Sequence, residues 1–132
     1  MKRAYSVDGF ELRVDGRILE MRTEGERGPG MDRNNRRTLE NFLASGSVRG
    51  VLFDVRRAHY RHGGVEGEEC IRTLARICRR HFTAVIGRAD QSTPTGKLVG
   101  LHAQMGGLGR AFRSRDHALE WLDRQVDAAP AR

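Results

Sequence analysis

Apolar and charged residues alternate near the start of the chain, from residue 10 to residue 22. Alternation at every second position predicts strands with one buried face. The pair Asp15-Gly16 divides the segment, and Asp-Gly is a favoured pair in two-residue hairpin turns. The pattern therefore predicts an N-terminal β-hairpin. We expect a short additional strand at residues 5–7, and a loop rich in helix and strand breakers at residues 25–30.

In the middle of the chain, the apolar residues first follow helical spacing and then form a continuous run. Residues 32–44 predict a helix whose apolar face consists of Leu39, Phe42 and Leu43, and its polar first half predicts an exposed or frayed start. The unbroken apolar run at residues 51–53 predicts a strand that is buried on both faces, and hence central and parallel. Residues 56–64 are polar and end in two glycines, so we expect a loop there.

The second half of the chain alternates helix and strand. Residues 65–80 predict the clearest amphipathic helix, with Cys70, Ile71, Leu74, Ala75, Ile77 and Cys78 on its apolar side. The remaining expected elements are a strand at 83–87, a helix that opens at 92 and ends at Gly106-Gly107, a strand at 111–112, and a final helix capped by Ser114.

This order predicts one α/β domain over residues 1–132, with right-handed crossovers, an ordered core over about residues 5–126 and a frayed tail at 127–132. A chain of 132 residues is of ordinary length for a single domain. The side chains expected to be buried are Phe10, Leu12, Ile18, Leu39, Phe42, Leu52, Phe53, Ile71, Leu74, Cys78, Val85, Leu101, Trp121 and Leu122.

Composition narrows the class of protein. Hydrophobic residues make up 38% and charged residues 31% of the chain, which fits a globular protein and excludes disorder. We expect a cytoplasmic protein, because no apolar stretch approaches the ~18 residues of a membrane span and the start lacks the apolar run of a signal peptide. Cys70 and Cys78 would stand about 12 Å apart along one helix, too far for a disulfide, so we expect two buried thiols.

Known catalytic and metal motifs fail on inspection. The segment Thr95-Gly96-Lys97 lacks the first glycine and the final hydroxyl residue of a phosphate-binding loop. His59 and His62, with Asp54 upstream, supply fewer ligands than a closed zinc site needs. We therefore predict no enzymatic activity, no metal and no cofactor.

The net charge is +7, and 22 of the 24 basic residues are arginines. These arginines concentrate around the expected loop at 56–64 and on the polar side of the following helix. A loop at the carboxyl end of a central strand is a common binding position in α/β sheets, and its glycines leave amides open at a helix start. The predicted functional surface, for an acidic protein or a phosphorylated headgroup, consists of Arg56, Arg57, His59, Tyr60, Arg61, His62, Gly63, Gly64, Arg72, Arg76 and Arg80.

Two segments carry a resemblance to a known family. The apolar strand closed by Asp54, and the strand–helix segment at residues 110–122, stand in an element order that resembles the STAS/SpoIIAA-like domain of anti-sigma-factor antagonists. That domain is similar in plan to the lipid-carrying CRAL-TRIO (Sec14) domain. The resemblance implies an α/β fold with a mixed sheet of about five strands, an N-terminal hairpin and four helices wound mainly on one face.

The resemblance also implies a non-enzymatic bacterial regulatory module that docks to a protein partner with an acidic surface. Such antagonists take a phosphate on a Ser or Thr after the central strand, but His62-Gly63-Gly64-Val65 holds no hydroxyl, so we expect no phosphoserine switch. The alternative function is binding of anionic lipid or a membrane surface. Nucleic-acid binding ranks third, because Tyr60 and Phe82 form a poor stacking platform.

Overall fold

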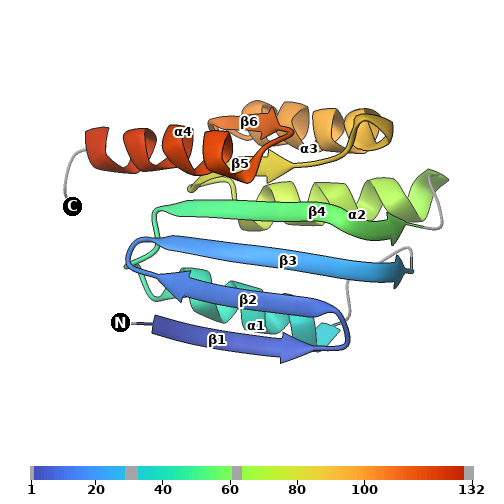
Figure 1. Ribbon diagram of the computed structural model, residues 1–132, viewed down its shortest axis with the longest axis horizontal. Helices are drawn as coiled ribbons and strands as arrows, with labels where there is room; N and C mark the ends of the chain where they lie inside the picture. The colour runs from blue at the N-terminus through green and yellow to red at the C-terminus, as the bar shows by residue number, and fades with distance from the viewer. Residues whose placement is uncertain (1, 29–32, 61–63, 130–132) are drawn as a thin grey trace.

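The computed structural model describes residues 2–28, 33–60 and 64–129. Within them lie six strands, four α-helices and one short 3₁₀ helix, in an α/β arrangement (Figure 1). The elements in order are β1 (Lys2–Val7), β2 (Phe10–Asp15), β3 (Ile18–Arg27), α1 (Arg33–Ala44), β4 (Gly50–Tyr60), α2 (Gly64–Ile77), β5 (Phe82–Ile86), η1 (Ala89–Gln91), α3 (Ser92–Gln104), β6 (Gly109–Phe112) and α4 (Arg115–Ala128).

The strands form one mixed sheet in the order β1-β2-β3-β4-β5-β6. The first three are antiparallel neighbours, and β3 to β6 run parallel to one another. The mixed sheet and the N-terminal hairpin are confirmed. The expected number of about five strands is one too few, because the short first segment pairs with β2 along its whole length.

Two tight turns connect the antiparallel strands. Asp8 and Gly9 both have positive φ, +47° and +79°, which is the requirement of a type I′ turn. The next turn differs from the prediction, because Asp15 pairs with Ile18 and the central residues are Gly16 and Arg17. Only Gly16 has a positive φ, +66°, as a glycine at the first central position of a type II′ turn does.

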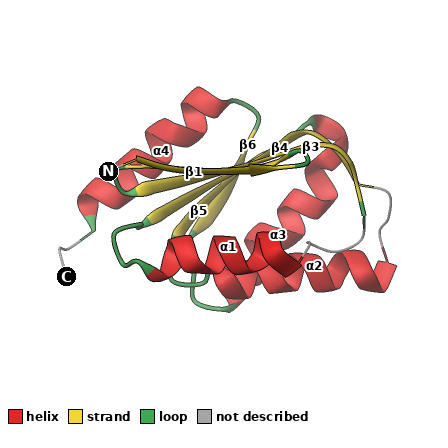
Figure 2. Ribbon diagram, turned by 90° about the horizontal axis from the view of Figure 1, so that it is seen from below, coloured by secondary structure: helices red, strands yellow, loops and turns green. Residues whose placement is uncertain are grey.

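Helices cover the two faces of the sheet unequally. Figure 2 shows α1, α2 and α3 beneath the sheet and α4 on the other face. The larger apolar cluster lies on the three-helix side and includes Phe10, Leu12, Leu39 and Phe53. A smaller cluster under α4 joins Leu52, Ala84, Ile86, Ala118 and Leu122. The expectation that helices wind mainly on one face is confirmed.

Most of the predicted core residues are buried, but not all. Ile18, Phe42, Ile71, Leu74, Leu101 and Trp121 are only half-buried and pack against the two clusters from their margins. Cys78 is buried as expected, whereas Cys70 is half-buried. The exposure on α2 has a local cause, since Ile71 and Leu74 border a hollow between this helix and the sheet.

The central strands are longer than predicted. β4 continues to Tyr60 and β3 to Arg27, so the loops expected at residues 56–64 and 25–30 are strands over much of their length. The two strands remain paired from Glu24 opposite Arg57 to Arg27 opposite Tyr60, beyond a register shift that leaves one extra residue in β4.

The helices differ from prediction at their ends. In the polar first half of α1, Asn35 is buried and its Oδ1 accepts a hydrogen bond from the Tyr5 hydroxyl at 3.1 Å, which ties the helix to β1. α2 ends at Ile77 rather than at residue 80, and α4 continues one residue beyond 127.

None of the described helices is both long enough and apolar enough to cross a membrane.

Candidate ligand-binding pocket

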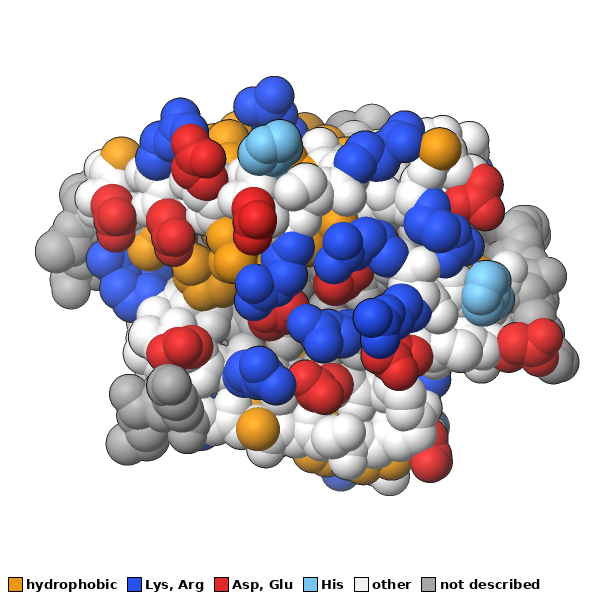
Figure 3. All heavy atoms as spheres, in the orientation of Figure 1, with side chains coloured by type: hydrophobic (Ala, Val, Ile, Leu, Met, Phe, Trp, Pro, Cys, Tyr) orange, Lys and Arg blue, Asp and Glu red, His pale blue; other side chains and the backbone are white. Residues whose placement is uncertain are grey.

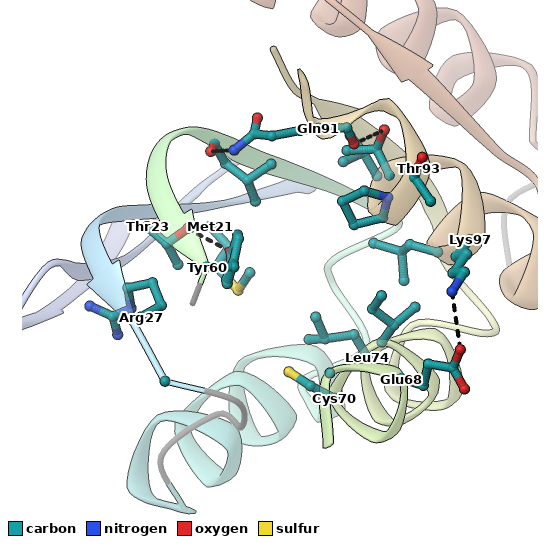
Figure 4. A pocket seen from close by; sticks show the side chains of 18 of the residues that line it. Met21, Thr23, Arg27, Tyr60, Glu68, Cys70, Leu74, Gln91, Thr93 and Lys97 are labelled. Carbon is teal, nitrogen blue, oxygen red and sulfur yellow. Dashed lines mark hydrogen bonds and ion pairs between the residues drawn. The ribbon is translucent and has the colours of Figure 1, made fainter. Parts of the chain in front are cut away.

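A pocket of about 350 Å³ opens between the carboxyl-terminal halves of β3 and β4, helix α2 and the start of α3 (Figure 4). Parallel strands deliver their carboxyl ends to one edge of a sheet, which is the usual binding edge in α/β folds. Its walls are mainly apolar, and the side chains that form them are Phe10, Met21, Val55, Cys70, Ile71, Leu74, Val85 and Leu98.

The pocket exists because α2 does not close completely onto the sheet. Ile71 and Leu74 point toward the sheet side of α2 and pack against the larger cluster, yet both stay half-buried. Across the hollow, Phe10 and Val85 are almost fully buried, with 1% exposure each. The apolar stripe of α2 therefore serves partly as core and partly as a pocket wall.

The polar groups deep in the pocket are already bonded to the protein. The Gln91 side-chain amide donates to the carbonyl oxygens of Val55 at 2.8 Å and Ala58 at 3.2 Å. Its Oε1 accepts from the Arg88 amide at 2.7 Å. The Thr95 hydroxyl donates to the Gln91 carbonyl at 2.9 Å. A ligand in this space therefore needs an apolar body, because the walls offer it few open hydrogen-bonding groups.

The opening is bordered by polar and charged side chains. Figure 4 shows Lys97 and Glu68 on one side, joined by an ion pair at 3.0 Å, and Arg27 and Tyr60 on the other. The hydroxyls of Tyr60 and Thr23 lie 3.1 Å apart. Tyr60 is 47% exposed as a whole residue, but desolvation of its phenol raises its pKa, against the smaller effects of the Thr23 hydrogen bond and the Arg27 charge, so the phenol keeps its proton at neutral pH.

The opposite face of the sheet carries a network of ion pairs. Arg56 binds both carboxylate oxygens of Asp54, at 2.9 and 3.0 Å. Arg115, the first residue of α4, binds both oxygens of Glu20 at 2.7 and 3.1 Å. Burial is the largest single effect and alone would raise the pKa values of Asp54 and Glu20, but the hydrogen bonds and charges of the neighbouring arginines together outweigh it and lower both. Arg22 lies between the two carboxylates, 3.2 Å from Glu20 and 3.9 Å from Asp54.

The predicted functional surface is divided by the sheet. Arg56 and Arg57 lie on the face that carries this network, where Figure 3 shows basic and acidic side chains interleaved. Arg57 is 77% exposed and lies 3.5 Å from Glu24, and His59 is exposed. Tyr60 belongs to the pocket instead.

The other predicted site residues lie elsewhere. Arg72, Arg76 and Arg80 are exposed on and just after α2, which packs against the opposite face of the sheet from Arg56. Gly64 is the first residue of α2, and Arg61, His62 and Gly63 lie outside the described residues. The structure therefore does not bring the described members together into one surface.

Sequence reasoning missed most of the pocket. Thr23 and Arg27 fell at or beyond the end of the expected hairpin, and Cys70, Ile71 and Leu74 were assigned to the core. The extended β3–β4 pairing was the missing information. Among the described residues, no three His, Cys, Asp or Glu side chains cluster closely enough to hold a metal ion.

Comparison with known proteins identifies the fold. No family model matches the chain, and no curated protein matches it. A solved structure from Shewanella loihica PV-4, described as an uncharacterized protein of the DUF3478 family with a SpoIIAA-like fold, superimposes with a TM-score of 0.51. It is 14% identical in sequence, and the match covers 92% of each chain. The chain has a SpoIIAA-like fold. At this identity the SpoIIAA-like comparison concerns architecture alone, and it agrees with the element order from which the resemblance was drawn.

Proposed function

We propose that this SpoIIAA-like chain is a non-enzymatic module that holds a small apolar or amphipathic molecule in the pocket between the sheet, α2 and α3. The observation that carries the proposal is the apolar hollow itself, at the carboxyl edge of the parallel strands. Ligand sites in proteins are typically concave and mainly apolar, with volumes of about 300–1,000 Å³. The hollow falls in the lower part of that range.

The residues in the pocket favour binding over catalysis. None of the described side chains that line it is a histidine, and its one described thiol belongs to Cys70. Glu68 is engaged with Lys97, and Gln91 and Thr95 are bonded to the main chain. General acid–base chemistry needs a positioned titratable group with an accessible proton, which Glu68, Gln91 and Thr95 do not offer.

The expected binding energy comes from apolar burial. Each buried methylene contributes about 0.8 kcal/mol, so a chain of about ten methylenes would contribute ~8 kcal/mol before the costs of association. Because 1 μM corresponds to about 8 kcal/mol of net binding energy, those costs place the expected dissociation constant of such a ligand above 1 μM.

A cavity-filling substitution tests the proposal. Leu74→Trp places an indole in the hollow, whereas Ala103→Trp adds the same group at an exposed position of α3. We expect saturable, one-to-one binding of the neutral dye Nile red to the wild type and to Ala103→Trp, and loss of binding in Leu74→Trp. Equal binding by all three folded proteins would show that the dye does not occupy this pocket.

A second candidate is the regulatory docking role implied by the family resemblance. Arg72, Arg76 and Arg80 are exposed, and no carboxylate among the described residues lies within ion-pair distance of them. A basic stripe with no ion-paired carboxylate among the described residues favours a protein partner with an acidic surface. We expect Arg72→Glu with Arg76→Glu to abolish capture of such a partner, while Arg36→Glu with Arg37→Glu on α1 retains it. Equal capture by both variants would refute this surface.

A further inference from the structure

The chemistry of the pocket also suggests which ligand it takes, an inference that rests on the proposed function. We propose that the ligand is a single-chain carboxylic acid, with its carboxylate at Arg27 and Tyr60 and its hydrocarbon tail inside the pocket. Three features of the site carry this assignment: the volume, the position of the charges and the open hydrogen-bond donors at the entrance.

The volume fits one chain. A water molecule occupies about 30 Å³ in the liquid and a methylene slightly less, so 350 Å³ accommodates roughly ten to fourteen carbons. The two acyl chains of a phospholipid together exceed this volume. The most deeply buried apolar side chains of the lining are Phe10, Met21 and Val85, and they suit the end of a hydrocarbon tail.

Among the described residues that line the pocket, one positive charge has no carboxylate partner. The charged members of this described lining are Arg27, Glu68 and Lys97. Glu68 and Lys97 neutralise each other on one side of the opening. The Nη1 of Arg27 donates to the main-chain carbonyls of Asp8 at 2.7 Å and Glu24 at 3.4 Å, and no carboxylate in the described part of the chain lies within ion-pair distance of it. The described side chains of the lining therefore carry a net charge of about +1, which favours an anionic head.

The donors at the entrance fit a carboxylate. With Nη1 engaged, Nε and Nη2 of Arg27 remain to donate, and a guanidinium binds a carboxylate through two parallel hydrogen bonds. If the Thr23 hydroxyl donates to Tyr60, the phenolic O–H is left to donate to the ligand. Arg27 and Tyr60 are directly paired residues of the neighbouring strands β3 and β4, so both groups lie at the same part of the entrance.

Titration calorimetry with dodecanoate and 1-dodecanol tests the assignment, because the two ligands share the chain and differ in the head. At pH 8 we expect Arg27→Gln to weaken dodecanoate binding by about 10- to 100-fold and to change dodecanol binding by less than about 2-fold. Arg27→Lys should retain most of the affinity for dodecanoate. Tyr60→Phe should weaken dodecanoate binding by about 3- to 10-fold.

The outcomes separate the two proposals. Equal weakening of both ligands by Arg27→Gln would mean that Arg27 only supports the neighbouring turn, and would overturn the carboxylate assignment while leaving the pocket. Binding of dodecanol but not of dodecanoate by the wild type would also overturn it. Tighter binding to phosphatidylglycerol vesicles than to dodecanoate would replace the single-chain ligand by a membrane. If neither ligand binds the wild type, or if Leu74→Trp leaves both affinities unchanged, the proposed function itself fails.

Discussion

The hollow beside α2 predicts an unusually small cost for removing a helical leucine. Leu74 borders the pocket and is half-buried, whereas Leu39 on α1 is fully buried in the same apolar cluster. Leu→Ala removes three carbons, worth about 2.4 kcal/mol when their burial is complete. For Leu39 the new cavity adds to this, so we expect a loss of ~3–4 kcal/mol in the free energy of unfolding. For Leu74 burial is partial and the space already exists, so we expect ~1 kcal/mol.

Urea unfolding of Leu74→Ala and Leu39→Ala, followed by far-UV circular dichroism, measures the difference. With an m-value of about 2 kcal/mol/M, a gap of ~2 kcal/mol separates the two midpoints by ~1 M. Both variants should keep the wild-type m-value, since neither changes the fold. Midpoints that agree within error would mean that α2 packs as tightly as α1, and that the pocket is filled by side chains in solution.

Three further predictions concern other parts of the molecule. A Cβ on Gly107 would stand 2.2 Å from Cε1 of the buried His102, so Gly107→Ala should lower the free energy of unfolding by ~2–4 kcal/mol. The same substitution should cost much less in a His102→Ala background, because the side chain that clashes is then absent. Equal costs in both backgrounds would exclude the clash. Because the pKa of Asp54 is lowered below its ordinary 3.8, its contribution to stability is present above that pH and lost as the pH falls below it. Asp54→Asn should therefore flatten the acid end of a stability–pH curve measured by urea unfolding, and an unchanged slope would contradict the lowered pKa. Burial raises the pKa of the Cys78 thiol to about 12, so a thiol reagent should label Cys70 before Cys78. Because Cys70 lines the pocket, dodecanoate should slow the labelling of Cys70. Faster labelling of Cys78 would be inconsistent with its burial.

Local patterns were sufficient to predict most of the elements. The alternation around Leu12 predicts the hairpin, the run at Val51 predicts the central strand, and Ser114 predicts the start of α4, where its Oγ accepts from the His117 amide at 3.5 Å. Each of these signals depends on neighbours in the sequence, and each is confirmed.

The extended end of β4 could not be predicted in this way. One extra residue in β4 places Arg56 and Arg57 on the same face of the sheet, which breaks the alternation that marks a strand. That face is open beyond α4, so charged side chains are tolerated there and the segment has the composition of a loop. Pairing with β3, far away in sequence, keeps it extended.

The pocket could not be predicted from the sequence for a different reason. An apolar stripe such as Ile71 and Leu74 has the same helical spacing whether the helix packs flush against a sheet or stands away from it. The difference depends on where α2 and α3 begin relative to the ends of β3 and β4, which is a tertiary property. Likewise, nothing in the local sequence indicates that Arg27 would lie at the entrance to a cavity.

Amide chemical-shift mapping with dodecanoate is the most direct test of the account. The wild-type protein, labelled with nitrogen-15, is titrated while its backbone amide resonances are followed. The account predicts shifts concentrated at the pocket, at Thr23, Arg27, Tyr60, Ile71 and Leu98, that saturate at one equivalent of ligand. Shifts that instead concentrate on the ion-paired face of the sheet, around Arg56 and Arg115, would contradict it.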